Sequence, residues 1–391
     1  MAQYRTAMTL YLDNDHVSSK RLRSRHAAAT HVALIGGLLL AAMVASADDR
    51  NVILVTLDGV RTQELFAGMD ATIAADDARS GAEDIAVTRK RYWRDTPEER
   101  RAALMPWFWG TLAPSGMVLG NQARGSKVTV RNPLWFSYPG YSEMLTGQPQ
   151  PDVLSNDLVR YPHQTVLDYA HRRLGLKPTE VAQIGSWDGF KMAASRTDGT
   201  FFMNGAFEPV PAALSTPEMD QLAALRKQVI EPWAESSNDT LTFRIALAYL
   251  HKHQPRVLWL GLGQSDDWAH ARRYDLVLDY LHLVDSQLAE LWRTIQTLDR
   301  YRDRTTLIIT TDHGRGRTPV DWVDHDTGIQ GSQDIWIAIL GPDTPAIGEV
   351  RDFPDVTQSD IAATMLQYLE LDYRDFNPAA GPPVPQSFSP R

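Results

Sequence analysis

The chain of 391 residues contains no cysteine. Disulfide bonds and thiolate metal ligands are therefore excluded, so any bound metal must be held by oxygen and nitrogen atoms. The chain also has no long block of like charge and no internal repeat. Its formal net charge of −9 argues against a protein that binds nucleic-acid duplexes, because contact with the phosphate backbone requires a basic surface.

The N-terminal region lacks an apolar run long enough to cross a membrane. Its apolar run, residues 32–44, is shorter than the ~20 residues that a spanning helix needs. A basic stretch precedes this run, and Ala45, Ser46 and Ala47 follow it. This order predicts a leader and signal peptide over residues 1–47, and a mature chain without a membrane span. We therefore expect an exported protein, either periplasmic or extracellular.

Unbroken apolar runs predict strands that are buried on both faces. Such runs cover residues 51–57, 257–262, 306–310 and 335–340, with a weaker one at 181–184. Segments with apolar residues at helical spacing separate them, at residues 165–173, 240–251, 274–298 and 359–369. This alternation predicts an α/β fold in which a mostly parallel sheet is sandwiched between helices.

Two stretches interrupt the alternation, at residues 65–125 and 190–237. We interpret them as insertions in a single domain of residues 48–376, which a Pro-rich extended tail, residues 377–391, follows. Within the first insertion, the segment Thr96-Pro97-Glu98-Glu99 predicts a capped helix start. We expect both insertions to wall the functional site. Tryptophans in or beside them either stack on a substrate or simply pack: Trp93, Trp107, Trp109 and Trp187.

Acidic residues follow two of the predicted strands. Asp58 comes directly after the first strand and precedes Gly59. Because ligands of parallel sheets gather at the carboxyl ends of strands, Asp58 is a candidate metal ligand, although Asp-Gly is also a common turn. Asp312 and His313 follow the strand at 306–310, and both reach one metal only if the backbone turns there, which Gly314 permits. The alternative is a satisfied strand-end Asp beside an exposed His.

Two more candidate ligands follow the strand at 257–262. Asp266 and His270 lie on one side of a helical turn if this segment is a helix, and Asp267 competes with Asp266 for the role of ligand. His325 lies in a polar loop before the last strand, where a lone histidine is more often simply solvated. Carboxylates and imidazoles of this kind form the ligand set of a two-metal hydrolytic site.

Ser137 is the candidate nucleophile. It begins the segment Ser137-Tyr138-Pro139-Gly140, which looks like a loop that enters a short helix. Free N–H groups and the helix dipole favour an anion at a helix N-terminus, such as a serine alkoxide or a phosphoryl group. The alternative is an ordinary Ser N-cap. Ser142 is the rival nucleophile, but it falls one turn inside the helix.

In this order along the chain, the motifs resemble those of the alkaline phosphatase superfamily, and most closely those of its phosphodiesterase and nucleotide-pyrophosphatase-like branch. The resemblance spans residues 58–325. It implies two divalent metal ions, usually zinc and sometimes manganese, and the mixed imidazole and carboxylate set suits zinc. The implied ligands are Asp266, His270 and His325 for one metal, and Asp58, Asp312 and His313 for the other.

The resemblance also implies hydrolysis of a small-molecule phosphate ester, monoester or diester, through a phosphoseryl intermediate on Ser137. Asn156 falls where this branch often places an Asn that hydrogen-bonds a phosphoryl oxygen. A hydrolase of sulfate esters or phosphonates is the alternative, although Tyr141 stands where sulfatases carry an Arg. A phosphomutase is less favoured because the mutases of this superfamily are cytoplasmic, whereas we expect export. A non-catalytic binding protein is less favoured because each inferred ligand position holds a competent residue.

Overall fold

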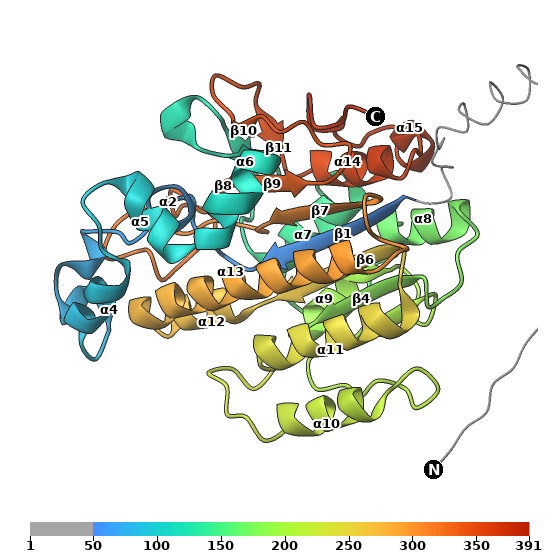
Figure 1. Ribbon diagram of the computed structural model, residues 1–391, viewed down its shortest axis with the longest axis horizontal. Helices are drawn as coiled ribbons and strands as arrows, with labels where there is room; N and C mark the ends of the chain where they lie inside the picture. The colour runs from blue at the N-terminus through green and yellow to red at the C-terminus, as the bar shows by residue number, and fades with distance from the viewer. Residues whose placement is uncertain (1–49, 391) are drawn as a thin grey trace, which may run out of the picture. The chain divides into compact units, whose positions relative to one another are not determined.

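The first apolar run forms β1 (Asn51–Leu57) in the computed structural model, which describes residues 50–390 (Figure 1). Every residue of β1 is buried, as expected for a central strand of a parallel sheet. It pairs in parallel with β6 (Val257–Leu262) on one side and with β7 (Thr305–Thr310) on the other. The expected signal peptide, residues 1–47, lies outside the described residues.

Shorter strands complete two sheets. They are β2 (Met117–Leu119), β3 (Val128–Thr129), β4 (Val181–Gly185), β5 (Phe202–Asn204), β8 (Asp334–Ile335), β9 (Ile337–Leu340), β10 (Gly348–Glu349) and β11 (Val356–Thr357). In the described part of the chain, the main sheet has eight strands in the order β10-β2-β9-β7-β1-β6-β4-β5, and β11, β3 and β8 form a second sheet. The main sheet is mostly parallel, and β9 runs antiparallel to both of its neighbours.

Helices of 4 to 24 residues lie outside the first insertion. They are α7 (Ser137–Thr146), α8 (Val166–Arg173), α9 (Asp188–Ala194), α10 (Pro217–Arg226), α11 (Asp239–His253), α12 (Gln264–His270), α13 (Tyr274–Thr297), α14 (Asp360–Tyr368) and α15 (Tyr373–Phe376). None of the described helices is long and apolar enough to cross a membrane.

Alternate side chains of β1 enter two different cores. Ile53, Val55 and Leu57 join one apolar cluster with residues of α11 and α13. Val52 and Leu54 point the other way and join a second cluster with residues of α7, α8 and α14. Figure 1 shows α11 and α13 crossing the near face of the sheet. Helices on both faces of a mostly parallel sheet confirm the predicted α/β fold.

The run predicted as one last strand, residues 335–340, is interrupted at Trp336, so β8 and β9 belong to different sheets. The Trp336 side chain is fully buried, and its indole N–H donates to the carbonyl of Val60 at 3.0 Å. The unbroken apolar sequence was enough to predict a strand here. The break at Trp336 and the antiparallel direction of β9 depend on pairing with distant residues.

The first insertion, residues 65–125, consists mainly of short helices. They are α2 (Thr62–Ala67), η2 (Ile73–Ala75), α3 (Asp77–Ser80), α4 (Ile85–Tyr92), α5 (Pro97–Leu104), the π-helix η3 (Phe108–Leu112), α6 (Ala113–Ser115) and η4 (Gln122–Arg124). Helix α5 begins at the predicted capping box, in which Thr96 and Glu99 bond to each other's backbone N–H groups. The local sequence of this segment therefore determines where helix α5 begins.

The C-terminal tail packs against the domain without forming a helix or strand beyond α15 in residues 377–390. Val384 and Ser387 are buried. The N–H of Val384 donates to the Thr364 hydroxyl at 2.9 Å, and the Tyr368 hydroxyl bonds to the carbonyl of Ser387. These contacts attach the tail to helix α14.

Candidate active site

Asp58 lies at the carboxyl end of β1 and is almost fully buried. Its Oδ2 accepts a hydrogen bond from the Tyr141 hydroxyl at 2.9 Å, and its carbonyl accepts one from the Ser265 hydroxyl at 2.6 Å. Gly59 follows with a φ of +62°, and a Cβ there would lie 2.8 Å from Asp266 Oδ1. Glycine is therefore required for both the backbone turn and the space beside the carboxylates.

Ser137 is the first residue of helix α7, whose N-cap is Phe136. The Ser137 side chain makes no capping bond; its Oγ lies 3.4 Å from Nε2 of His313 instead. Gly140, in the next turn, lets α7 approach the strand end closely, because a Cβ there would lie 2.7 Å from the carbonyl oxygen of Asp312. The N-terminus of α7 thus points the hydroxyl at the cluster of acidic and imidazole side chains.

Asp312 and His313 come just after β7 and are completely buried. Asp312 Oδ1 accepts a hydrogen bond from the N–H of Gly59 at 3.1 Å. His313 Nδ1 lies 2.8 Å from the carbonyl of Gly314, an acceptor, so Nδ1 carries the proton. His313 Nε2 then faces Asp58 Oδ1 at 3.3 Å and Asp312 Oδ2 at 3.4 Å. Both adjacent side chains do reach one site, as the sequence analysis required.

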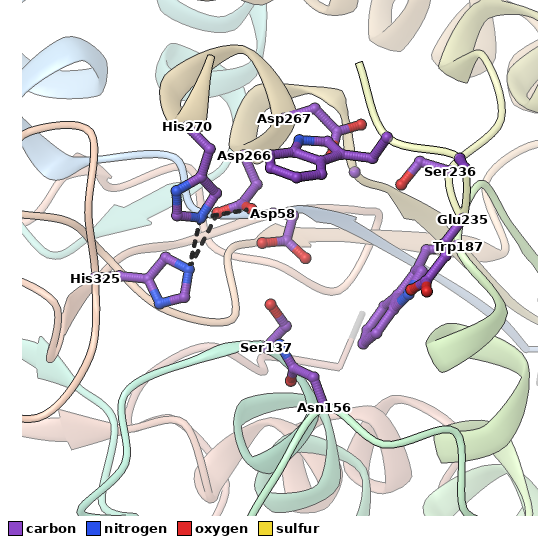
Figure 2. A pocket seen from close by; sticks show the side chains of 13 residues that line it. Asp58, Ser137, Asn156, Trp187, Glu235, Ser236, Asp266, Asp267, His270 and His325 are labelled. Carbon is purple, nitrogen blue, oxygen red and sulfur yellow. Dashed lines mark hydrogen bonds and ion pairs between the residues drawn. The ribbon is translucent and has the colours of Figure 1, made fainter. Parts of the chain in front are cut away.

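Asp266, His270 and His325 meet on the other side of His313. Asp266 and His270 belong to α12, and His270 Nε2 lies 3.3 Å from Asp266 Oδ2. His270 Nε2 is also 3.0 Å from His325 Nε2, which lies 3.6 Å from Asp266 Oδ1. Figure 2 shows these three side chains converging. The loop histidine is not simply solvated, because its side chain is only 12% exposed.

These residues fit divalent metal ions. Within the described residues, two groups place their ligand atoms within 4.8 Å of one another: Asp58, Asp312 and His313, and Asp266, His313 and His325. Asp58 Oδ1 and Asp312 Oδ2 are buried and accept no hydrogen bond from the described residues. Buried carboxylate oxygens without donors are costly unless a cation satisfies them. The donor set is oxygen and nitrogen, as the absence of cysteine demands.

Burial and crowded charges shift the pKa values of the site. Burial and the neighbouring Asp58 carboxylate raise the pKa of Asp312 to about 8. Burial lowers the pKa of His270, and it lowers that of His325 well below its usual value, with the charge of His313 as the next cause for both. Although burial lowers the pKa of His313, the Asp312 and Asp58 carboxylates raise it to about 9. Because metal ions bind carboxylates and neutral imidazoles, metal binding would release the protons that Asp312 and His313 hold.

Arg315 is a component that the sequence analysis missed. It is 2% exposed, and its guanidinium pairs with Asp266 Oδ1 and donates to the carbonyl of Val323 at 2.5 Å. Burial lowers its pKa to about 9. Arg315 therefore links helix α12 to the loop that carries His325. Its position directly after Asp-His-Gly was the only sequence signal for this role.

The site opens into a pocket of about 560 Å³ that Asp58, Ser137, His270 and His325 line. The second insertion forms part of its wall through the segment 233–236, as expected. No described residue of the first insertion lines the pocket, so the prediction that this insertion also walls the site is wrong.

Of the four tryptophans named from the sequence, only Trp187 lines the pocket, and Trp233 was missed. The others pack against the insertion, as shown by the Arg100 guanidinium 4.6 Å from the Trp93 ring and that of Arg101 3.6 Å from the Trp109 ring. These three rings are partly buried and do not line this pocket, which favours the interpretation that they simply pack.

Asn156 and Asp267 also line the pocket. Asn156 Oδ1 accepts a hydrogen bond from the N–H of Tyr138 at 2.9 Å, which fixes its side chain beside Ser137 (Figure 2). Burial, followed by the charge of Asp239, raises the pKa of Asp267 to about 8. Asp266, and not Asp267, belongs to a metal-competent group. Ser142 does not line the pocket.

The chain matches no protein-family model and has no match among curated proteins. Its fold does resemble solved structures. Alkaline phosphatase PafA has a TM-score of 0.54 at 10% identity, over 87% of this chain and 99% of that one. A putative sulfatase from Bacteroides thetaiotaomicron has a TM-score of 0.51 at 12% identity, over 83% and 71% of the two chains. Phosphonate monoester hydrolase of Agrobacterium radiobacter has a TM-score of 0.50 at 12% identity, over 82% and 74%.

These neighbours are hydrolases of the alkaline phosphatase superfamily. At such low identity the likeness concerns the fold, and the finer resemblance to the nucleotide-pyrophosphatase-like branch stays a prediction. The chain therefore has the alkaline-phosphatase-like fold.

Proposed function

We propose that this chain is an exported, metal-dependent hydrolase of phosphate esters, a phosphodiesterase or phosphomonoesterase, that acts through a phosphoseryl intermediate on Ser137. The observation that carries the proposal is the position of the Ser137 hydroxyl. Its Oγ lies at the N-terminus of α7 and 3.4 Å from His313, on the edge of the buried carboxylate cluster. The order of the motifs along the chain supports the nucleotide-pyrophosphatase-like branch.

Asp58, Asp312 and His313 would hold one metal ion, and Asp266, His270 and His325 the other. The mixed donor set favours zinc over manganese. When bound, the two ions lower the pKa of the nucleophile and neutralise charge on the phosphoryl and leaving oxygens.

The protein's own groups position the reaction. Ser137 Oγ forms a bond to phosphorus, and the bond between phosphorus and the ester oxygen breaks, which releases the alcohol. Water then cleaves the phosphoserine and releases phosphate or a phosphate monoester. The N-terminus of α7 favours the anionic phosphoryl group. Asn156, held by the N–H of Tyr138, donates its amide to a phosphoryl oxygen.

The Ser137→Ala variant tests the nucleophile. We expect hydrolysis of p-nitrophenyl phosphate and bis-p-nitrophenyl phosphate to fall at least about 10³-fold, while metal content and unfolding temperature stay at wild-type values. Ser142→Ala, in the same helix but outside the pocket lining, is the matched control and should keep its activity. Full activity of Ser137→Ala would overturn the assignment. Quenched wild-type enzyme should carry a phosphoryl group on the peptide that contains Ser137.

The same assay separates the substrate classes. Nitrophenyl sulfate and a nitrophenyl phosphonate should be hydrolysed more slowly than the phosphate esters. Turnover of the sulfate ester alone would favour the alternative hydrolase. Export is tested by cell fractionation, in which we expect a periplasmic or secreted chain that lacks residues 1–47.

A further inference from the structure

The pocket has a wall that the phosphoryl chemistry does not use. Figure 2 shows Trp187, Glu235 and Ser236 across the pocket from His270 and His325. A volume of about 560 Å³ is far larger than one phosphoryl group and falls within the range of sites for small organic ligands. This wall therefore faces the organic substituent of the ester.

Two tryptophans contribute to the wall. Trp187 is held by edge contacts, with its ring centroid 6.4 Å from that of Tyr138 and 5.6 Å from that of Phe190. Trp233 is 48% exposed, and its ring centroid lies 6.3 Å from that of His270. An exposed indole that lines a pocket offers its π-electrons to a ligand, and a cation is the partner that such a face attracts.

The other feature of the wall is uncompensated negative charge. Glu235 lines the pocket with an exposed carboxylate. Of the 13 described residues that line the pocket, none is Lys or Arg. Metal ions would compensate Asp58 and Asp266, but Glu235 belongs to neither metal-competent group.

We propose that the substituent of the phosphate ester carries a positive charge of the alkylammonium type. It lies beside Trp187 and Trp233, and Glu235 provides the counter-charge. This inference rests on the proposed phosphate-ester hydrolysis and names its substrate class. An anionic substituent is repelled by the Glu235 carboxylate, and a neutral one gains neither the cation–π nor the ionic contact.

A pair of isosteric substrates tests the charge alone. Choline phosphate and 3,3-dimethylbutyl phosphate differ only in whether the trimethyl-bearing centre is a charged nitrogen or a carbon. With the full-length, zinc-loaded protein we expect kcat/KM to be at least about 10-fold higher for choline phosphate. Glu235→Gln and Trp233→Leu should each reduce this ratio. Glu218→Gln, which removes a charge on α10 outside this pocket, should leave the ratio unchanged.

Binding of choline itself separates failure of this inference from failure of the proposed activity. Choline should quench tryptophan fluorescence of the wild type and of Ser137→Ala at lower concentration than 3,3-dimethylbutanol does, and Trp233→Leu should weaken the effect. If neither ester is hydrolysed but choline binds selectively, the proposed hydrolysis fails and the cation site stands. Equal kcat/KM for the two esters, or no difference between choline and its carbon analogue, overturns the inference.

Discussion

At the scale of single residues, the two ring nitrogens of His313 have different partners. Nδ1 bonds to the carbonyl of Gly314, and Nε2 faces Asp58, Asp312 and Ser137. A backbone acceptor on one nitrogen fixes the tautomer and leaves the other nitrogen free to act as a ligand. The residue types were readable from the sequence, whereas this choice of nitrogen depends on the turn after β7.

The adjacent carboxylates Asp266 and Asp267 should respond differently to substitution. We expect Asp266→Asn to lose about one metal ion per chain, because its carboxylate lies among His270, His313 and His325. Asp267→Asn should retain both ions. Elemental analysis of the purified variants measures this difference. A loss of metal from Asp267→Asn with retention in Asp266→Asn would show that Asp267, and not Asp266, is the metal ligand.

Asp285 gives a prediction about pH. Burial raises its pKa to about 6, although its oxygens accept hydrogen bonds from the N–H groups of Trp107 and Phe108, both at 2.8 Å. A carboxyl group whose pKa is higher in the folded state stabilises the fold below its unfolded pKa, and that contribution is lost as pH rises through the folded value. A shift of about two units corresponds to roughly 3 kcal/mol as an upper bound.

The matched variant is Asp285→Asn, which cannot titrate. The free energy of unfolding of the wild type, relative to this variant, should fall by up to about 3 kcal/mol between pH 4 and pH 7. Urea denaturation at a series of pH values measures it. Other titrating groups are common to both proteins and cancel in the difference. A difference that does not change with pH would contradict the prediction.

At the scale of elements, the site depends on how closely α7 packs on the end of β7. Gly140→Ala would place a Cβ 2.7 Å from the carbonyl oxygen of Asp312. We expect a loss of about 1–3 kcal/mol in stability from overpacking, and a larger than tenfold loss of kcat, about the effect of a small misplacement of Ser137. Urea denaturation and steady-state kinetics measure the two effects.

Gly110 provides the control for this substitution. It lies in the π-helix η3, and a Cβ there would meet no atom within 4 Å. Gly110→Ala should therefore change stability by no more than about 1 kcal/mol and leave kcat unchanged. Equal effects at the two glycines would show that helix propensity, and not the contact with Asp312, is responsible.

At the scale of the whole molecule, three strands of the main sheet and helix α7 come together at the site. Metal binding should therefore stabilise the entire fold. Removal of the ions with a chelator should lower the unfolding temperature, and zinc at about 100 times its dissociation constant should restore about 2.7 kcal/mol. Differential scanning calorimetry measures this. Ser137→Ala should respond as the wild type does, whereas Asp312→Asn should respond less; an unfolding temperature unaffected by chelation in the wild type would contradict metal binding.

The sequence alone determined the central strands and the local helix starts. An unbroken apolar run such as β1 predicts a strand that is covered on both faces. The capping box at Thr96 involves only four consecutive residues, so it can be recognised from local sequence. The absence of cysteine determined that ligand atoms are oxygen and nitrogen. The order of Asp58, Ser137, Asp312 and His313 named candidates that the structure then brought together.

Tertiary structure decided what depends on contacts between distant residues. The antiparallel direction of β9, the pairing of Arg315 with Asp266 across 49 positions, and the placement of Trp233 rather than Trp93 in the pocket all follow from packing of separate elements. Local propensity and periodicity carry no information about such partners, because the residues in contact are far apart in the sequence. Ser137 had a plausible local role as a helix cap, but in the structure Phe136 is the N-cap and the Ser137 hydroxyl faces His313.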